Sequence, residues 1–283
     1  MKLATFSVQG RRGWGLIKDD KAIDVSKSTD CKYPTLLSFL TANGESGEIL
    51  EAVKAGTTYD LGQLDWLPVI DSPGKILCIG LNYEMHRLEA GRAQTGNPSV
   101  FTRFADSQVG HNAPILRPKV STELDYEGEL AIVIGKGGRY IPRAQAMQHV
   151  AGYACYNDAT VRDWQRHTPQ FIPGKNFPRT GAFGPWMVTA DEISNPAALQ
   201  IETRINGLVV QSARLDQLIF SIPVLIEYCS SFTALSPGDV IATGTPGGVG
   251  FKRQPPLFLH PGDQVEVEIK GVGLLSNGVV DED

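Results

Sequence analysis

Three carboxylates occupy alternate positions at the start of one apolar segment. The sequence reads Asp125-Tyr-Glu-Gly-Glu129 and continues directly into Leu-Ala-Ile-Val-Ile. Side chains alternate along an extended strand, so Asp125, Glu127 and Glu129 are expected on one face. Carboxylates that enter the interior together repel one another and lose hydration, and a bound cation relieves both costs. The alternative is a solvated acidic strand end before the core begins.

A further carboxylate closes another apolar segment. Asn157-Asp158 follows Gly152-Tyr-Ala-Cys-Tyr156 and precedes a predicted helix. Asp158 can cap that helix, or it can complete an oxygen site with Glu127 and Glu129. Three oxygen ligands with open positions suit Mg²⁺ or Mn²⁺, which retain waters or bind substrate oxygens. Zinc would prefer histidine or cysteine, and neither lies beside these carboxylates in sequence.

His86 and Glu89 are three residues apart on a helix predicted over residues 83–91. This spacing makes them neighbours on one helical face. A carboxylate beside an imidazole can orient the ring and raise its basicity, as a general base requires. A surface pair on an exposed helix is the alternative.

Two cations have unusual surroundings in the sequence. Lys175 lies in the predicted loop Pro173-Gly-Lys-Asn-Phe177, and Arg103 lies between aromatic residues in Phe101-Thr-Arg-Phe104. Either cation can bind a substrate carboxylate. The alternatives are a solvated loop lysine and an arginine that extends from the strand to solvent.

A glycine-rich segment, Gly244-Thr-Pro-Gly-Gly-Val-Gly250, follows a predicted strand over residues 239–243. Its glycines let backbone N–H groups approach an anion or a developing oxyanion. The segment lacks the lysine and the spacing of a phosphate-binding loop, and the dinucleotide-binding fingerprint is absent from the sequence.

Composition restricts the class of protein. A chain of 283 residues can form one large domain, or one large and one small domain. The net charge is −5 and no basic run occurs, which argues against a nucleic-acid partner. No apolar stretch approaches the ~20 residues that span a bilayer. The four cysteines are scattered, which favours buried free thiols in a reducing cytoplasm: Cys31, Cys78, Cys155 and Cys229.

The pattern of the chain changes near residue 70. Residues 2–25 read as short strands, and helices are predicted over about 34–42 and 46–55. Leu67-Pro68 and Asp71-Ser-Pro-Gly74 then form a predicted linker. We therefore expect a small N-terminal domain, residues 1–70, and a larger domain, residues 71–283.

The second part is predicted to be rich in strands. Asn206-Gly207 lies between two apolar runs and is typical of a tight hairpin turn. The predicted strands cover residues 75–80, 99–104, 130–134, 152–157, 185–190, 200–211, 239–243 and 264–270, and the predicted helices cover 83–91, 142–149, 159–166 and 221–231. Because the predicted strands and helices do not alternate regularly along the chain, a doubly wound parallel sheet is disfavoured.

Together these segments resemble the fumarylacetoacetate hydrolase superfamily. The resemblance covers roughly residues 74–283, and residues 1–70 resemble the accessory domain of many bacterial members. It implies an α+β fold with a mixed β-sandwich or roll, a small N-terminal α/β domain, a homodimer, and Mg²⁺ or Mn²⁺ in the site. The segments that carry it are 75–89, 125–136, Ala151-Gly-Tyr with Asn157-Asp158, Arg162-Asp163 and Gln165, Gly174-Lys175, Gly184-Pro-Trp186 and 237–250.

The resemblance also implies site residues. The metal ligands of the family fall on Glu127, Glu129 and Asp158, whereas Asp125 matches a residue that is not usually a ligand. The lid-helix dyad falls on His86 and Glu89, and the active-site lysine on Lys175. Substrate contacts are implied by the resemblance for Arg162, Gln165 and Thr245. A substrate contact of Arg103 is expected from its position between aromatic residues. Arg103 departs from the family pattern, because many members have lysine there.

The expected activity is hydrolysis of a carbon–carbon bond in a 2,4-diketo acid through a metal-stabilised enolate. His86 would activate the attacking water, and Lys175 with the N–H groups near Gly244 and Thr245 would stabilise negative charge. The alternatives are a decarboxylase of oxaloacetate-like 2-oxo acids, or an isomerase or hydratase. A non-catalytic, metal-stabilised binding module is disfavoured because the dyad, the lysine and the glycine-rich segment occur together. Residues 166–173 and 176–179 differ from many relatives, which leaves the substrate open.

Overall fold

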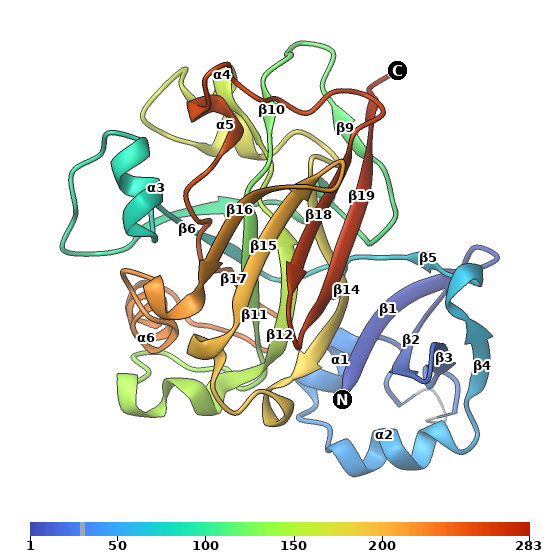
Figure 1. Ribbon diagram of the computed structural model, residues 1–283. Helices are drawn as coiled ribbons and strands as arrows, with labels where there is room; N and C mark the ends of the chain where they lie inside the picture. Colours follow the sequence, from blue (N-terminus) through green and yellow to red (C-terminus); the bar gives the residue numbers. More distant parts are fainter. Residues whose placement is uncertain (29–31) are drawn as a thin grey trace.

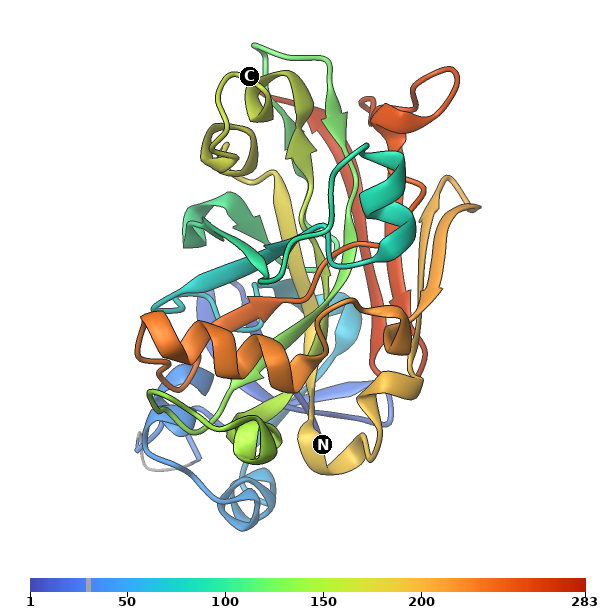
Figure 2. The same ribbon diagram turned by 90° about the vertical axis from the view of Figure 1, so that its left-hand side faces the viewer.

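Two packed β-sheets form the core of the protein. The computed structural model describes residues 1–28 and 32–283. Figure 1 shows the smaller sheet lying in front of the central strands of the larger one, and Figure 2 shows the molecule turned by 90°. The mixed α+β fold predicted from the sequence is confirmed, with large sheets and few helices.

The large sheet has the strand order β4-β3-β2-β1-β14-β12-β11-β17-β6-β7, with β5 paired to β1 and β8 paired to β14. Its strands are β1 (Lys2–Val8), β2 (Arg11–Lys18), β3 (Lys21–Asp24), β4 (Thr57–Asp60), β5 (Asp65–Trp66), β6 (Ile76–Gly80), β7 (Ser99–Arg103), β8 (Gln108–Val109), β11 (Gly128–Ile134), β12 (Val150–Asn157), β14 (Gly181–Thr189) and β17 (Val240–Ala242).

The second sheet has five strands in the order β16-β15-β18-β19-β9, and a short pair, β10–β13, stands apart. These strands are β9 (Ile115–Arg117), β10 (Leu124–Asp125), β13 (Thr160–Val161), β15 (Gln200–Ile205), β16 (Leu208–Arg214), β18 (Gln264–Ile269) and β19 (Gly273–Asp281). The helices are α1 (Leu36–Thr41), α2 (Ser46–Val53), α3 (Glu84–Glu89), α4 (Arg162–Gln165), α5 (Ile172–Lys175) and α6 (Ile222–Phe232). None of these helices has the length and apolar character needed to cross a membrane.

Strand β11 is buried on both faces, which explains its continuous apolar run. Leu130 and Ile132 pack into the core between the two sheets, whereas Ala131 and Val133 pack into a second core that contains α1. Because side chains alternate, Glu129 shares the face of Ala131 and Val133. The sequence thus directs the acidic end of this strand toward one defined face of the large sheet.

The N-terminal segment extends the large sheet. Strand β1 pairs with β14 as well as with β2, with Leu3 opposite Met187. Leu3 and Phe39 share a hydrophobic cluster with Val133 and Met187. The strands and helices predicted for residues 1–70 are present, but they form a common core with the remainder of the chain. The division into two domains at residue 70 remains a prediction.

Several local predictions need correction. Residues 143–149 form a 3-10 helix. Residues 159–166 divide into β13 and the single turn α4, because Leu124 pairs with Val161. Lys175, predicted in a loop, ends the one-turn helix α5. The hairpin at Asn206-Gly207 is confirmed, since both residues have positive φ and join β15 to β16.

Buried thiols are present as predicted. Cys78, Cys155 and Cys229 are free and buried. Cys31 lies outside the described residues.

His111 joins the N-terminal segment to the second sheet. Its ring packs edge-on against Trp66, with the ring centroids 5.5 Å apart, and its Nδ1 accepts a hydrogen bond of 3.1 Å from the Ser276 N–H. Burial lowers the pKa of His111 to about 4. The imidazole is therefore neutral in the folded protein near neutral pH.

This lowered pKa predicts loss of stability in mild acid. The unfolded chain takes up a proton at His111 near pH ~6.5, whereas the folded chain does so only near pH 4. The free energy of unfolding should therefore fall as the pH drops through this window. Denaturant unfolding of His111→Asn should show a weaker fall than the wild type. Exchange of the exposed His260 for Asn is the control, and identical pH profiles for the wild type and His111→Asn would exclude this role.

Candidate metal centre and active site

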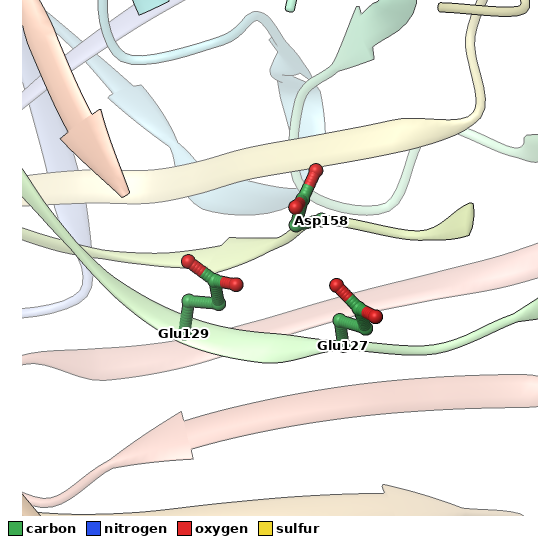
Figure 3. A group of neighbouring side chains, drawn as sticks. All are labelled: Glu127, Glu129 and Asp158. Atoms are coloured by element: carbon green, nitrogen blue, oxygen red, sulfur yellow. The ribbon is translucent and has the colours of Figure 1, made fainter. Parts of the chain in front are cut away.

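Three buried carboxylates converge at adjacent strand ends. Glu129 lies on β11, Glu127 lies immediately before it, and Asp158 immediately follows β12. Gly128 pairs with Asn157, and this register brings both glutamates beside Asp158. One oxygen from each carboxylate lies within 4.8 Å of the others, and Figure 3 shows the three groups facing one another. The predicted clustering is present.

Asp158 does not act as the helix cap considered for it. Helix α4 begins at Arg162, and its N-cap residue, Val161, provides no side-chain hydrogen bond. Asp158 instead has a carboxylate oxygen within 4.8 Å of oxygens of Glu127 and Glu129, so its carboxylate belongs to the cluster.

Asp125 lies apart from the three clustered carboxylates. The chain leaves β10 after Asp125 and enters β11 only at Gly128, so the expected continuous strand is wrong here. The Asp125 carboxylate accepts hydrogen bonds from the N–H groups of Gly250 at 2.8 Å and Phe251 at 3.1 Å. It also accepts a bond of 2.8 Å from Arg162 Nε. Asp125 therefore ties the glycine-rich segment to Arg162.

Glu127 is compensated by cations from two other segments. Lys175 Nζ lies 2.6 Å from Glu127 Oε2 and 2.5 Å from Asp158 Oδ2. Arg162 Nη2 lies 2.6 Å from Glu127 Oε1. Burial opposes ionisation of Glu127, but Lys175 and Arg162 outweigh it and lower the pKa of this carboxyl group. Glu127 is ionised across the physiological range.

Glu129 has a different environment. Its carboxylate accepts a hydrogen bond of 2.8 Å from the Gly244 N–H, and no cationic side chain pairs with it in the described chain. Burial and repulsion by Asp158 and Glu127 raise the pKa of Glu129 well above its usual value. A carboxylate in this setting is stabilised by a cation that binds it directly.

The charges of the buried site do not cancel. Four ionisable carboxylates face three permanent or stabilised cations, which leaves one excess negative charge when all are ionised. A divalent ion would reverse this excess, and the oxygen-only ligand set fits Mg²⁺ or Mn²⁺. The groups are Asp125, Glu127, Glu129 and Asp158 against Arg103, Arg162 and Lys175.

His86 is buried, and its partner Glu89 is half-buried, with 23% of its side chain exposed. His86 is 6% exposed, and its Nδ1 lies 2.8 Å from Glu89 Oε1. The other oxygen of Glu89 accepts a hydrogen bond of 2.9 Å from the Gly248 N–H. A carboxylate accepts hydrogen bonds, so Nδ1 carries the proton and Nε2 is the basic nitrogen. The alternative of a solvated helix pair is excluded.

Asn82 fixes the start of the segment that carries this pair. Its amide donates to the Phe220 and Thr243 carbonyls at 3.0 and 2.8 Å, and its side-chain oxygen accepts from the Phe220 N–H. Leu81 has a positive φ of 59°, so the chain turns sharply between β6 and α3. Asn82 was not predicted as a functional residue, because its only distinctive feature in the sequence is its position between a strand and a helix.

The glycine-rich segment differs from its predicted role. The N–H groups of Gly244, Gly248 and Gly250 each donate to a protein carboxylate, so the expected oxyanion contact at Gly244 is wrong. Thr245 Oγ1 donates to the Gly128 carbonyl at 2.9 Å and accepts from Gln211 Nε2 at 2.8 Å. The segment holds the carboxylates of Glu129, Glu89 and Asp125 in place.

Gln211 is a further residue that sequence reasoning missed. It lies on β16 of the smaller sheet and is 2% exposed. Its amide oxygen accepts from the Gly128 N–H at 3.1 Å, and its amide nitrogen donates to Thr245 and Pro246. Gln211 therefore connects Gly128, which lies between the metal-ligand candidates Glu127 and Glu129, with the glycine-rich segment.

A cavity of about 610 Å³ opens onto these groups. Gln165 Oε1 accepts a hydrogen bond of 3.0 Å from Arg162 Nη1 at its wall. The predicted site residues that line the cavity are His86, Glu127, Glu129, Asp158, Arg162, Gln165, Lys175 and Thr245. Residues from distant segments of the sequence thus converge on one cavity.

Arg103 does not line this cavity. Its guanidinium is fully buried and donates to Asp158 Oδ1 at 2.8 Å, to the Ala159 carbonyl at 2.7 Å and to Thr180 at 2.9 Å. These contacts satisfy the group and fix Asp158. The geometry favours this positioning role over the predicted substrate contact.

Comparison with known proteins identifies the family. The model of the fumarylacetoacetate (FAA) hydrolase C-terminal family matches residues 75–280. The chain belongs to the fumarylacetoacetate hydrolase family. This family match covers the strands and helices that provide the metal-ligand candidates, the dyad and Lys175.

Two relatives found by sequence comparison are both named oxaloacetate tautomerases. The chain is 46% identical over 216 residues to "Oxaloacetate tautomerase fahd2, mitochondrial" of Xenopus laevis, covering 76% of this chain and 68% of that protein. It is 38% identical over 300 residues to oxaloacetate tautomerase YisK of Bacillus subtilis (strain 168), covering 99% of this chain and 100% of that protein.

Two solved structures share the fold over whole chains. The fumarylacetoacetate hydrolase of Exiguobacterium antarcticum superposes with a TM-score of 0.88 at 34% identity, with 100% of both chains covered. The maleylpyruvate hydrolase of Sphingobium sp. SYK-6, in complex with manganese(II) ion and pyruvate, has a TM-score of 0.84 at 29% identity and the same coverage. A divalent-metal site thus has a precedent in this fold.

Because Glu129 has no cationic partner in the described chain, its substitution should weaken metal binding without breaking an ion pair. Glu129→Gln removes a ligand charge without leaving a buried lysine or arginine unpaired. The variant should fold and lose at least about tenfold in Mg²⁺ affinity, a loss in the range that perturbed metal sites show. Calorimetric titration measures this change. The exposed Glu268→Gln should bind Mg²⁺ like the wild type, and equal affinity of the wild type and Glu129→Gln would remove Glu129 from the ligand set.

Proposed function

We propose that this protein is a divalent-metal-dependent oxaloacetate tautomerase, which interconverts the keto and enol forms of oxaloacetate. The observation that carries the proposal is the likeness to oxaloacetate tautomerase YisK over 99% of this chain and 100% of that protein. This function corresponds to the isomerase alternative of the sequence analysis. The 2,4-diketo acid hydrolase takes second place.

The site supports binding of a small 2-oxo acid. When bound, Mg²⁺ or Mn²⁺ would supply a Lewis acid for the oxygens of such a substrate. Lys175 and Arg162 lie at the carboxylate cluster and also line the cavity. Burial disfavours the charged form of Lys175, but Asp158 and Glu127 outweigh this effect and raise the pKa of its ammonium group. Lys175 is therefore a cation that stabilises negative charge on the substrate oxygen.

His86 is the group that moves the proton. Glu89 holds Nδ1–H, so the basic Nε2 is available to remove a proton from C3 of the keto acid. As the C3–H bond breaks, a C2–C3 double bond forms and negative charge develops on the 2-oxo oxygen. Return of the proton from His86 to that oxygen gives the enol, and the net reaction consumes no water.

A second candidate uses the same base for a different step. The His86–Glu89 dyad can instead activate a water molecule, which a carbon–carbon hydrolase requires. The likeness to a maleylpyruvate hydrolase supports this alternative.

We further expect a homodimer, because the family resemblance implies one. A cytoplasmic location and the absence of a nucleic-acid or membrane partner are expected from the composition of the sequence.

Substitution of the dyad tests the proposal. With Mg²⁺ present, His86→Ala should slow keto–enol interconversion by ~10²–10⁴-fold, the usual contribution of a positioned general base. Glu89→Gln should slow it less, because it affects only the orientation of the imidazole. The ultraviolet absorbance of the enol and deuterium uptake at C3 measure the rate above the spontaneous background. Mg²⁺ affinity of His86→Ala should be unchanged.

The exposed His260→Ala is the matched control for His86→Ala and should retain the wild-type rate of interconversion.

The products of the reaction distinguish the tautomerase from a decarboxylase and from a hydrolase. Pyruvate release from oxaloacetate without faster interconversion would identify a decarboxylase. Cleavage of an acylpyruvate at a rate far above oxaloacetate interconversion would identify the hydrolase.

A further inference from the structure

Cationic side chains in the cavity wall fall into two groups. Arg162 and Lys175 are paired with the buried carboxylates, and Arg166 Nη2 lies 2.6 Å from Glu123 Oε2. Arg92 and Lys252 also line the cavity, but neither forms an ion pair with a carboxylate of the described residues. The wall therefore has two cations that remain available to an incoming anion.

Arg92 is anchored by its backbone while its side chain remains exposed. Its N–H donates to the Arg87 carbonyl at 3.1 Å, and the Arg87 guanidinium donates back to the Arg92 carbonyl. Arg87 is itself held by Glu84. These contacts attach Arg92 to the end of α3, the helix that carries His86.

Arg92 also lines a smaller neighbouring cavity of about 240 Å³. The two cavities share the residues Gly80, Leu81, Arg92, Pro169 and Phe171 in their walls. Arg92 therefore stands where the active-site cavity continues away from the carboxylate cluster. Arg92 and the carboxylate cluster thus line one cavity, which leaves a path from the cluster toward Arg92 for the far end of a bound substrate.

Lys252 enters the wall from another segment. It follows Gly250 and Phe251, whose N–H groups bind Asp125, and the Phe251 ring lies 4.3 Å from the Arg162 guanidinium carbon. The Lys252 backbone is thus held beside Asp125 and Arg162, whereas the residue itself is exposed. Figure 2 shows α3 and the segment after β17 on the same side of the molecule.

We infer that Arg92, assisted by Lys252, binds the distal carboxylate of a dicarboxylate substrate. This inference rests on the proposed function, which requires the 2-oxo acid end of the substrate at the metal centre. A second carboxylate needs a charge-assisted partner, and a guanidinium can bind it with two parallel hydrogen bonds. Arg92 and Lys252 are the cavity cations without a protein carboxylate in the described chain.

The position of Arg92 adds a consequence for catalysis. Because Arg92 is attached to the end of α3, its contact with the distal carboxylate also fixes the helix that carries His86. Substrate recognition and placement of the base over C3 are thereby linked. An acylpyruvate with an uncharged tail lacks the group that makes this contact.

A pair of substrates tests the inference with Mg²⁺-loaded enzyme. Oxaloacetate and its 4-methyl ester share the C3 proton but differ in the distal charge. Arg92→Gln should lower kcat/KM for oxaloacetate by ~10–100-fold, as expected for loss of a charge-assisted hydrogen bond, and leave the ester unchanged. Lys252→Gln should have a smaller effect of the same kind. Arg139→Gln, an exposed change outside the cavity, is the control. An equal fall for both substrates overturns the inference.

A binding measurement separates this inference from the proposed function. Difluoro-oxaloacetate has no C3 proton and cannot tautomerise, so calorimetry can compare it with its 4-methyl ester. The wild type should prefer the diacid, and Arg92→Gln should lose that preference. This result would support the distal-carboxylate site even if oxaloacetate is not tautomerised. Equal affinity of the wild type for the two analogues would refute the site whatever the activity.

Discussion

The structure depends on keeping several like charges buried at adjacent strand ends. Isolated carboxylates inside a protein are costly, so each must find a cation or N–H donors. Lys175 from α5 and Arg162 from α4 compensate Glu127, and Arg103 from β7 compensates Asp158. The charges that remain provide an electrostatic reason for a divalent ion at this position. The short helices and loops around the sheet mainly serve to deliver these groups.

The glycine-rich segment is the second organising feature. The N–H groups of Gly244, Gly248 and Gly250 bind Glu129, Glu89 and Asp125. One segment thus holds a metal-ligand candidate, the carboxylate that pairs with the His86 imidazole, and the anchor of Arg162. Side chains would obstruct such close approach; a Cβ at position 250 would lie 1.9 Å from the Leu257 carbonyl oxygen. This explains why glycines recur here.

The sequence predicted the parts of the site that follow from local pattern. The alternating spacing predicted that Glu127 and Glu129 lie together, although only Glu129 lies on β11, and helical spacing predicted that His86 pairs with Glu89. Family resemblance supplied Lys175. Contacts between distant segments were not predictable: the sequence did not reveal that Gly244 donates to Glu129 or that Gln211 reaches across from the second sheet. These depend on strand register and sheet packing, which no local pattern encodes.

A crystal structure of the Mn²⁺-loaded protein, with the ion located by its anomalous scattering, tests the account most directly. The account predicts one ion bound by oxygens of Glu127, Glu129 and Asp158 at about 2.0–2.2 Å, close to the Mg²⁺–oxygen distance. Lys175 Nζ should then lie farther than 2.6 Å from Glu127 and no longer pair with both carboxylates. An ion bound elsewhere, or Lys175 still paired with both carboxylates while no ion binds, would contradict the account.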